Sequence, residues 1–230
     1  MPVLYRSASA LNREQHRDLR LKPLAKPLSF VATSHVLPAM LDEFAPAARE
    51  IPIVFLPEKD TIVPVFLFSV RAGHNSFVTE EGMWSVSYLP AYIRRYPFIL
   101  GDIEGRDPIL CFDDTFEGFN KESGEALFEA DGGPTKALQD IMQFSGGMKD
   151  ATDRTARFAK RLKELDLFRS VTVDVKSKSA GQATINGLLV VDEAKLMASS
   201  EAVISELHKL GYLPAIYAHL FSLGAMTTLS

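Results

Sequence analysis

The sequence predicts an α+β protein with a single compact domain, in which an N-terminal half rich in short antiparallel strands precedes a mainly helical C-terminal half. Short β-branched and aromatic runs, divided by turn residues, fill residues 30–128. In residues 129–230, apolar residues recur three or four positions apart, as on one helix face. The 230 residues are 47% hydrophobic and 23% charged, which is typical of a chain that buries its own core. Residues 1–29 form a basic lead-in.

The first element predicted after the lead-in is a helix. Ser34 can act as its N-cap, and Pro38 then lies in the first turn, where its missing N–H costs nothing. An apolar stripe at helical spacing supports this prediction, and it consists of Leu37, Leu41, Phe44 and Ala48.

A β-hairpin is predicted next, from residues 51–56 and 62–70. Proline cannot donate a hydrogen bond to a neighbouring strand, so we expect Pro52 and Pro64 at a strand start, an edge or a bulge. Further short strands are expected at residues 76–78, 83–88, 98–100 and 109–112.

Two amphipathic helices are predicted at the start of the C-terminal part. Residues 135–144 and 152–165 both place apolar residues three and four positions apart. Gly146 and Gly147 lie between these segments, and glycine is a poor helix former. The sequence therefore predicts a break at the glycine pair.

The remaining C-terminal residues predict a second hairpin followed by helices. Residues 171–175 alternate apolar and polar side chains, and residues 183–191 resume this extended pattern. Asp192 can cap a short helix directly after the hairpin. Residues 201–210 predict another helix, and the last helix is expected to start near Pro214.

The net charge and the single cysteine indicate which partners and which kind of thiol to expect. The net charge of -4 supplies no overall attraction to a phosphate backbone, so nucleic acid is not an expected partner. Cys111 is the only cysteine, lies in an apolar run and is expected to be a core thiol with a raised pKa.

The N-terminus lacks the apolar segment of a secretory signal, and a cytoplasmic location is expected. Residues 210–230 are uncharged but diluted by polar residues, which predicts a buried helix rather than membrane association.

The strongest candidate for a binding site is residues 82–98, which combine the only tryptophan with several tyrosines and two arginines. Aromatic side chains can wall a pocket, and a guanidinium offers rigid donors to a carboxylate or phosphate. Arg94 is the preferred anchor for an anionic ligand. The same residues are also typical of core packing, with an arginine lying along the surface. The candidate ligand-binding residues are Asn75, Trp84, Tyr88, Tyr92, Arg94 and Tyr96.

A metal site is the alternative. Two histidines and a carboxylate can form a facial metal site if folding brings them together, and His74, Asp113 and His219 are the candidates. His16 and His35 are further possible ligands. A packed helix residue, with a ring nitrogen bonded to a neighbour, is the other interpretation of His219. Phosphate-loop, dinucleotide-binding and nucleophile-elbow motifs are absent from the sequence.

Residues 88–98, Tyr-Leu-Pro-Ala-Tyr-Ile-Arg-Arg-Tyr-Pro-Phe, resemble the signature of the SapC family. Further segments resemble family landmarks in the same order, so the resemblance covers nearly the whole chain: residues 52–55, 73–77, 82–84, 127–128, 185–188 and 217–223. The resemblance implies association with bacterial surface-layer loci and, through gene context, with peptide or amino-acid metabolism. It carries over no catalytic residue and no cofactor. A permease role, which family members are sometimes given, requires several spanning helices and is at odds with this sequence.

The sequence and the resemblance together favour a non-catalytic accessory or binding protein. Its expected partner is a small peptide, an amino-acid-like ligand or another protein. The alternative function is a metal-dependent enzyme that acts on a peptide or amino-acid-like substrate. A scaffold held at the membrane by the last helix is a third hypothesis.

Overall fold

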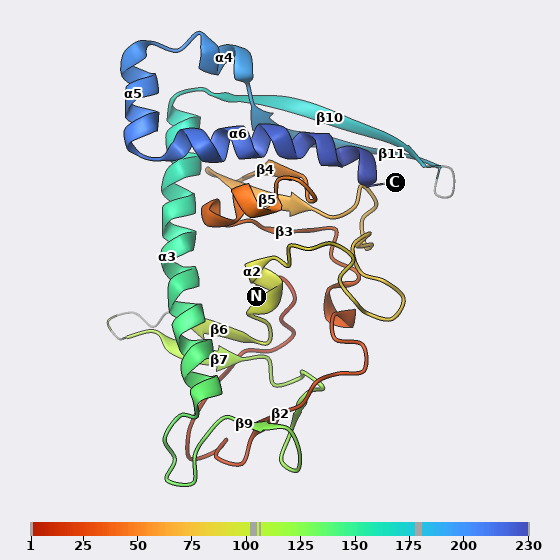
Figure 1. Cartoon of the computed structure of the whole chain (residues 1–230), viewed down its shortest axis with the longest axis vertical. Helices are drawn as coiled ribbons and strands as arrows, with labels where there is room; N and C mark the ends of the chain where they lie inside the picture. The colour runs from red at the N-terminus through yellow and green to blue at the C-terminus, as the bar shows by residue number, and fades with distance from the viewer. Residues whose placement is uncertain (1, 102–104, 106, 178–180, 230) are drawn as a thin grey trace.

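Small antiparallel sheets and one long helix organise the molecule (Figure 1). The computed structural model describes residues 2–101, 105, 107–177 and 181–229. Within these residues the strands form three antiparallel sheets, and most of the helical residues lie in the C-terminal half, which confirms the predicted α+β class.

The largest sheet has five strands in the order β10-β11-β4-β5-β3. Its strands are β3 (Val36–Pro38), β4 (Ile53–Glu58), β5 (Thr61–Leu67), β10 (Phe168–Ser177) and β11 (Gly181–Val191). Both predicted hairpins are confirmed, as β4 with β5 and as β10 with β11. The single pair Leu189↔Phe55 joins the two hairpins, so the sheet is assembled from segments more than 100 residues apart.

Two smaller sheets lie at the other end of the molecule (Figure 1). The first has the order β1-β7-β6, and the second has the order β8-β2-β9. The lead-in supplies one strand to each, which ties it to the rest of the fold. The strands are β1 (Ser9–Ala10), β2 (Arg20–Leu21), β6 (Phe98–Gly101), β7 (Ile109–Phe112), β8 (Phe119–Asn120) and β9 (Glu125–Ala126).

The strands expected at residues 98–100 and 109–112 are therefore confirmed as β6 and β7. Those expected at residues 76–78 and 83–88 are wrong, because only the isolated bridge between Val78 and Trp84 forms there.

The helix predicted from Ser34 is wrong at its N-terminal end. Residues Val36–Pro38 form β3, which pairs with β5, and only the short 3₁₀ helix η2 (Leu41–Glu43) and α1 (Phe44–Ala47) follow. Pairing with β5 thus overrides the helical spacing of the local sequence, because helix propensity is a weak preference that tertiary context outweighs. A further 3₁₀ helix, η1 (Ser29–Val31), precedes β3.

The two prolines of the first hairpin lie in different settings. Pro52 directly precedes β4, as expected, whereas Pro64 lies inside β5 opposite Phe55. The Pro64 carbonyl accepts the Ala39 N–H at 3.0 Å, just beyond the end of β3. Because Pro64 has no N–H, it cannot return a hydrogen bond to Ala39, and the pairing of β3 with β5 ends there.

The break predicted at the glycine pair is also wrong. A single helix of 29 residues, α3 (Lys136–Glu164), continues through Gly146 and Gly147, and the Thr135 hydroxyl caps it by accepting the Leu138 N–H. It runs along the side of the molecule and contacts both β5 and β6 (Figure 1). Packing at both ends of the helix outweighs the glycine cost of about 1 kcal/mol per residue.

The remaining helices are α2 (Ala91–Arg94), α4 (Glu193–Met197), α5 (Glu201–Lys209), α6 (Tyr212–Ser222) and the 3₁₀ helix η3 (Leu223–Thr228). The cap predicted at Asp192 is confirmed, since its side chain accepts the N–H groups of Ala194 and Lys195. The last helix packs on β4 and β11 and buries Ile216 and His219. No helix in the described residues is long and apolar enough to cross a membrane.

The main core lies between the five-stranded sheet and the helices. Phe55 of β4 is fully buried, and its ring lies 6.3 Å from both the Phe44 and the Phe158 ring centroids. This cluster anchors the C-terminal half of α3 on the sheet. The helix also packs against β6, and the space between β6 and the middle of α3 holds the candidate site described next.

Candidate ligand-binding site

Most of the predicted ligand-binding side chains make internal contacts. Trp84 packs edge-on against Phe68, and its ring N–H donates to the Tyr88 carbonyl at 2.7 Å. Asn75 is 1% exposed, accepts the Phe77 N–H at 3.0 Å and donates to a carbonyl of η1. The side chains of these two residues thus hydrogen-bond within the fold and hold the loop between β5 and α2.

The Tyr88 hydroxyl is hydrogen-bonded to a buried carboxylate. Its hydroxyl donates to Glu43 Oε1 at 2.8 Å, and the same oxygen accepts the Ala91 N–H at 2.7 Å. The other oxygen accepts the Met40 N–H at 2.9 Å, so Glu43, only 4% exposed, joins η2 to the start of α2. Burial, together with this carboxylate, raises the pKa of Tyr88 well above its usual range.

The Tyr96 hydroxyl is hydrogen-bonded to Asp113 in a similar way. Its hydroxyl donates to Asp113 Oδ2 at 3.2 Å, and its ring stacks on Phe30 at 4.3 Å. Burial alone would raise the pKa of Asp113, but hydrogen bonds from the Thr115 hydroxyl, from backbone N–H groups and from Tyr96 outweigh it and lower the pKa. Asp113 is thus an ionised carboxylate that is already surrounded by donors within the fold.

The structure does not bring His74, Asp113 and His219 together. Within the described residues, no group of three or more His, Cys, Asp or Glu side chains is placed to hold a metal ion. His219 has both ring nitrogens engaged: Nε2 accepts the Val191 N–H at 3.0 Å, and Nδ1 donates to the Ile53 carbonyl at 2.9 Å. His16 Nδ1 accepts the Asn12 N–H within its own turn. The backbone carbonyl of His35 pairs with Phe68 beside the sheet.

Arg94 and Arg95 line different pockets of the structure. Arg94, the expected anchor, is exposed on the surface of α2, and its guanidinium lies 5.1 Å from the centre of the Phe144 ring. Arg95 follows the helix and is half-buried, with its guanidinium stacked 3.9 Å above the Tyr92 ring and 5.7 Å from the Tyr5 ring. Arg95 is therefore held by aromatic rings on the inner side of the segment.

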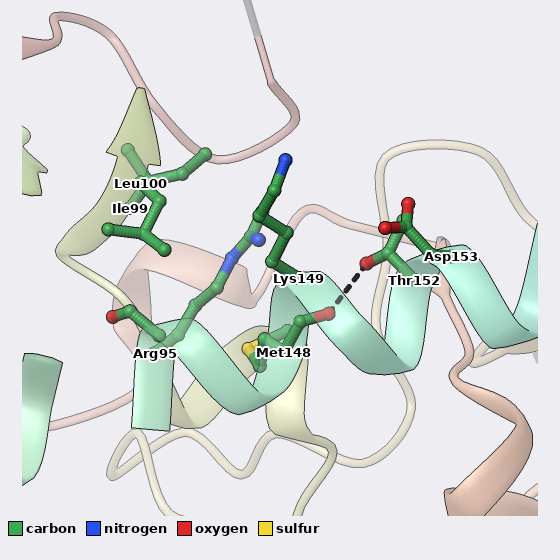
Figure 2. Close-up of a pocket in the computed structure, with 8 residues that line it drawn as sticks. Arg95, Ile99, Leu100, Met148, Lys149, Thr152 and Asp153 are labelled. Carbon is green, nitrogen blue, oxygen red and sulfur yellow. Dashed lines mark hydrogen bonds between the residues drawn. The ribbon is translucent and has the colours of Figure 1, made fainter. Parts of the chain in front are cut away.

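Arg95 points into a cavity of about 180 Å³ between β6 and the middle of α3, which we call the α3–β6 cavity (Figure 2). Ile99 and Leu100 of β6 form one wall. The other wall is one face of α3, consisting of Ser145, Met148, Lys149, Thr152 and Asp153. The Thr152 hydroxyl is bonded to the Met148 carbonyl at 2.8 Å, as the dashed line in Figure 2 shows.

Two residues of the cavity lining, Arg95 and Ser145, each have a buried polar side-chain atom without a hydrogen-bond partner in the described structure. These atoms are Nε of Arg95 and the hydroxyl oxygen of Ser145. Ser145 is 5% exposed, so bulk water does not replace a partner there. A buried polar group without a partner costs about 1–3 kcal/mol, and such groups are rare in native proteins. Both residues line the same cavity, which makes it the candidate site of this fold.

A larger apolar groove adjoins the cavity at Arg95. It has a volume of about 770 Å³ and shares Arg95 and Thr152 with the cavity. Tyr92, Ile62 of β5 and Ala156 of α3 line it, so an apolar part of a ligand can be accommodated next to the guanidinium.

The family of this chain follows from comparison with known proteins. The family model described as SapC matches residues 11–229, which is nearly the whole chain. This chain belongs to the SapC family. No curated protein and no solved structure matches it. The SapC match includes every residue of the α3–β6 cavity and confirms the resemblance seen in the sequence.

The predicted segment of this SapC chain, residues 82–98, supplies Arg95 to the cavity, whereas the α3 wall was not predicted. The wall residues occupy positions 145, 148, 149, 152 and 153, which is the spacing of a single helix face. This signal becomes visible only if one helix continues through Gly146 and Gly147. The predicted break divided the face into two unrelated pieces.

Proposed function

We propose that this protein is a non-catalytic binding protein for a small carboxylate-bearing molecule of the amino-acid or short-peptide type, held in the α3–β6 cavity. The single observation that carries this proposal is that Arg95 and Ser145, which line the same cavity, each have a buried polar atom, Nε and Oγ, without a partner in the described structure. A carboxylate would accept a hydrogen bond from each.

Arg95 is suited to this role because its guanidinium is already fixed. Stacking on Tyr92 at 3.9 Å restricts the side chain, so little conformational entropy is lost when a ligand binds. The planar guanidinium can also bind a carboxylate through two parallel hydrogen bonds.

A carboxylate of the lining favours an amino-acid-like ligand. The Asp153 carboxylate can accept hydrogen bonds from an ammonium group. Ile99 and Met148 provide apolar surface for a side chain. The cavity thus offers complementary groups for each part of an amino acid.

The binding function is preferred over the metal-dependent enzyme. The described lining contains neither histidine nor cysteine, and the described residues form no metal-binding group. An accessory role linked to surface-layer loci rests on the family resemblance alone and is compatible with a binding protein.

Isothermal titration calorimetry with the twenty amino acids and their carboxamides tests this proposal. We expect at least one free amino acid to bind and its carboxamide to bind far more weakly. Arg95→Gln should weaken binding about ten- to hundred-fold, since a charge-assisted hydrogen bond contributes roughly 1.5–3 kcal/mol. Arg94→Gln is the matched control and should bind as the wild type does. Equal effects of the two substitutions, or equal affinity for acid and amide, would contradict the proposal.

A further inference from the structure

The α3–β6 cavity lies at the open edge of a β-sheet. The sheet order β1-β7-β6 leaves one side of β6 without a strand partner in the described structure. Ile99 and Leu100 are consecutive residues of β6, and their side chains point to opposite faces of the sheet. Because both residues line the cavity, the cavity lies along the strand edge and not over one face.

The backbone of Leu100 presents its hydrogen-bonding groups at this edge. The Phe98 N–H donates to the Arg95 carbonyl at 2.8 Å, and the Phe98 carbonyl accepts the Tyr5 hydroxyl at 2.6 Å, so the backbone groups of Phe98 face away from β7. Groups on alternate residues of an antiparallel strand face the same side. The N–H and C=O of Leu100 therefore also face the open edge.

The hydrogen bonds of the neighbouring strand β7 lead independently to the same orientation of the Leu100 backbone groups. Leu110 of β7 is the residue opposite Leu100, and its carbonyl accepts the Leu11 N–H at 2.8 Å at the end of β1. The backbone groups of Leu110 thus face β1 and not β6. Leu100 and Leu110 form a pair without mutual hydrogen bonds, which leaves the groups of Leu100 directed toward the cavity side.

We infer that the ligand is the C-terminal end of a peptide, which binds in extended conformation along the edge of β6. This inference rests on the proposed function, because the terminal carboxylate occupies the site formed by Arg95 and Ser145. One residue of the peptide then forms a pair of backbone hydrogen bonds with the N–H and C=O of Leu100. Addition of a peptide strand to an exposed sheet edge is a common mode of recognition.

Peptide length and backbone methylation test this inference without altering the protein. Calorimetry compares free leucine with the tripeptide Ala-Ala-Leu, and with the two forms of this tripeptide that carry an N-methyl group on one or the other peptide nitrogen. We expect Ala-Ala-Leu to bind about ten-fold more tightly than leucine, from two backbone hydrogen bonds of about 1 kcal/mol or less each. Successive N–H groups of a strand point to opposite sides, so only one of the two methyl groups should remove this gain.

The possible outcomes separate the two proposals. If leucine binds in an Arg95-dependent manner but the tripeptide gains nothing, or if the two methylated peptides bind equally, the strand-edge inference is wrong and the proposed function stands. If the binding of leucine and of Ala-Ala-Leu does not depend on Arg95, while Arg95→Gln remains folded by circular dichroism, the proposed function itself is wrong.

Discussion

His219 should make the stability of this protein depend on pH. Its ring is fully buried, and burial lowers its pKa from 6.5 to about 4, with the hydrogen bond to the Ile53 carbonyl acting in the opposite direction. Because the Ile53 oxygen can only accept, Nδ1 carries the proton and Nε2 is the acceptor for Val191. Protonation of Nε2 would break the bond to Val191 and place a charge in the core.

The magnitude follows from the difference between the two pKa values. The unfolded chain binds a proton near pH 6.5, whereas the folded protein resists protonation down to about pH 4. The stabilising contribution of neutral His219 is therefore complete above pH 6.5 and is lost as the pH falls toward 4. Between pH 7 and pH 5, this residue alone should lower the free energy of unfolding by about 2 kcal/mol.

Urea unfolding followed by circular dichroism at pH 7 and pH 5 measures this loss. In His219→Gln, the carboxamide can still donate and accept a hydrogen bond but does not titrate, so its loss of stability should be about 2 kcal/mol smaller than that of the wild type. His208→Gln, at an exposed position of α5, is the matched control and should behave as the wild type does. Equal losses in the wild type and in His219→Gln would refute the reasoning.

Further substitutions test the packing and the long helix. Phe158→Ala removes a fully buried ring and should cost about 3–5 kcal/mol in urea unfolding, whereas Phe221→Ala, at a side chain that is 74% exposed, should change stability by less than about 0.5 kcal/mol. Gly146→Ala should stabilise the protein by about 0.5–1 kcal/mol, because a Cβ there meets no atom within 4 Å; destabilisation would mean that α3 is not continuous. Burial raises the pKa of Cys111, so iodoacetamide should label the folded protein more slowly than the urea-unfolded chain at pH 8, and equal rates would contradict its position.

Local patterns predicted the elements that depend on neighbours in the sequence. The two hairpins follow from alternating side chains and turn residues, and the cap at Asp192 follows from its position before an apolar helix. The wrong predictions concern segments whose secondary structure depends on residues far away in the sequence. The stripe Leu37, Leu41, Phe44 and Ala48 has helical spacing, but β5 captures its first part as a strand.

The candidate site overlaps the predicted segment but not the predicted anchor. Residues 82–98 supply Arg95 to the cavity and Tyr92 to the adjoining groove, whereas Arg94 was the expected anchor. Adjacent residues at the end of a short helix point in directions about 100° apart, and the sequence alone does not show which of them faces inward. The second wall comes from α3, about 50 residues further along the chain, and is brought to Arg95 only by the tertiary fold.

A crystal structure of the protein grown with saturating leucine tests the central claim most directly. The account predicts the amino acid in the α3–β6 cavity, with its carboxylate within hydrogen-bonding distance of Arg95 Nε and Ser145 Oγ. Leucine bound instead at the exposed face of Arg94, or a cavity that holds no ligand while leucine occupies another surface, would contradict it.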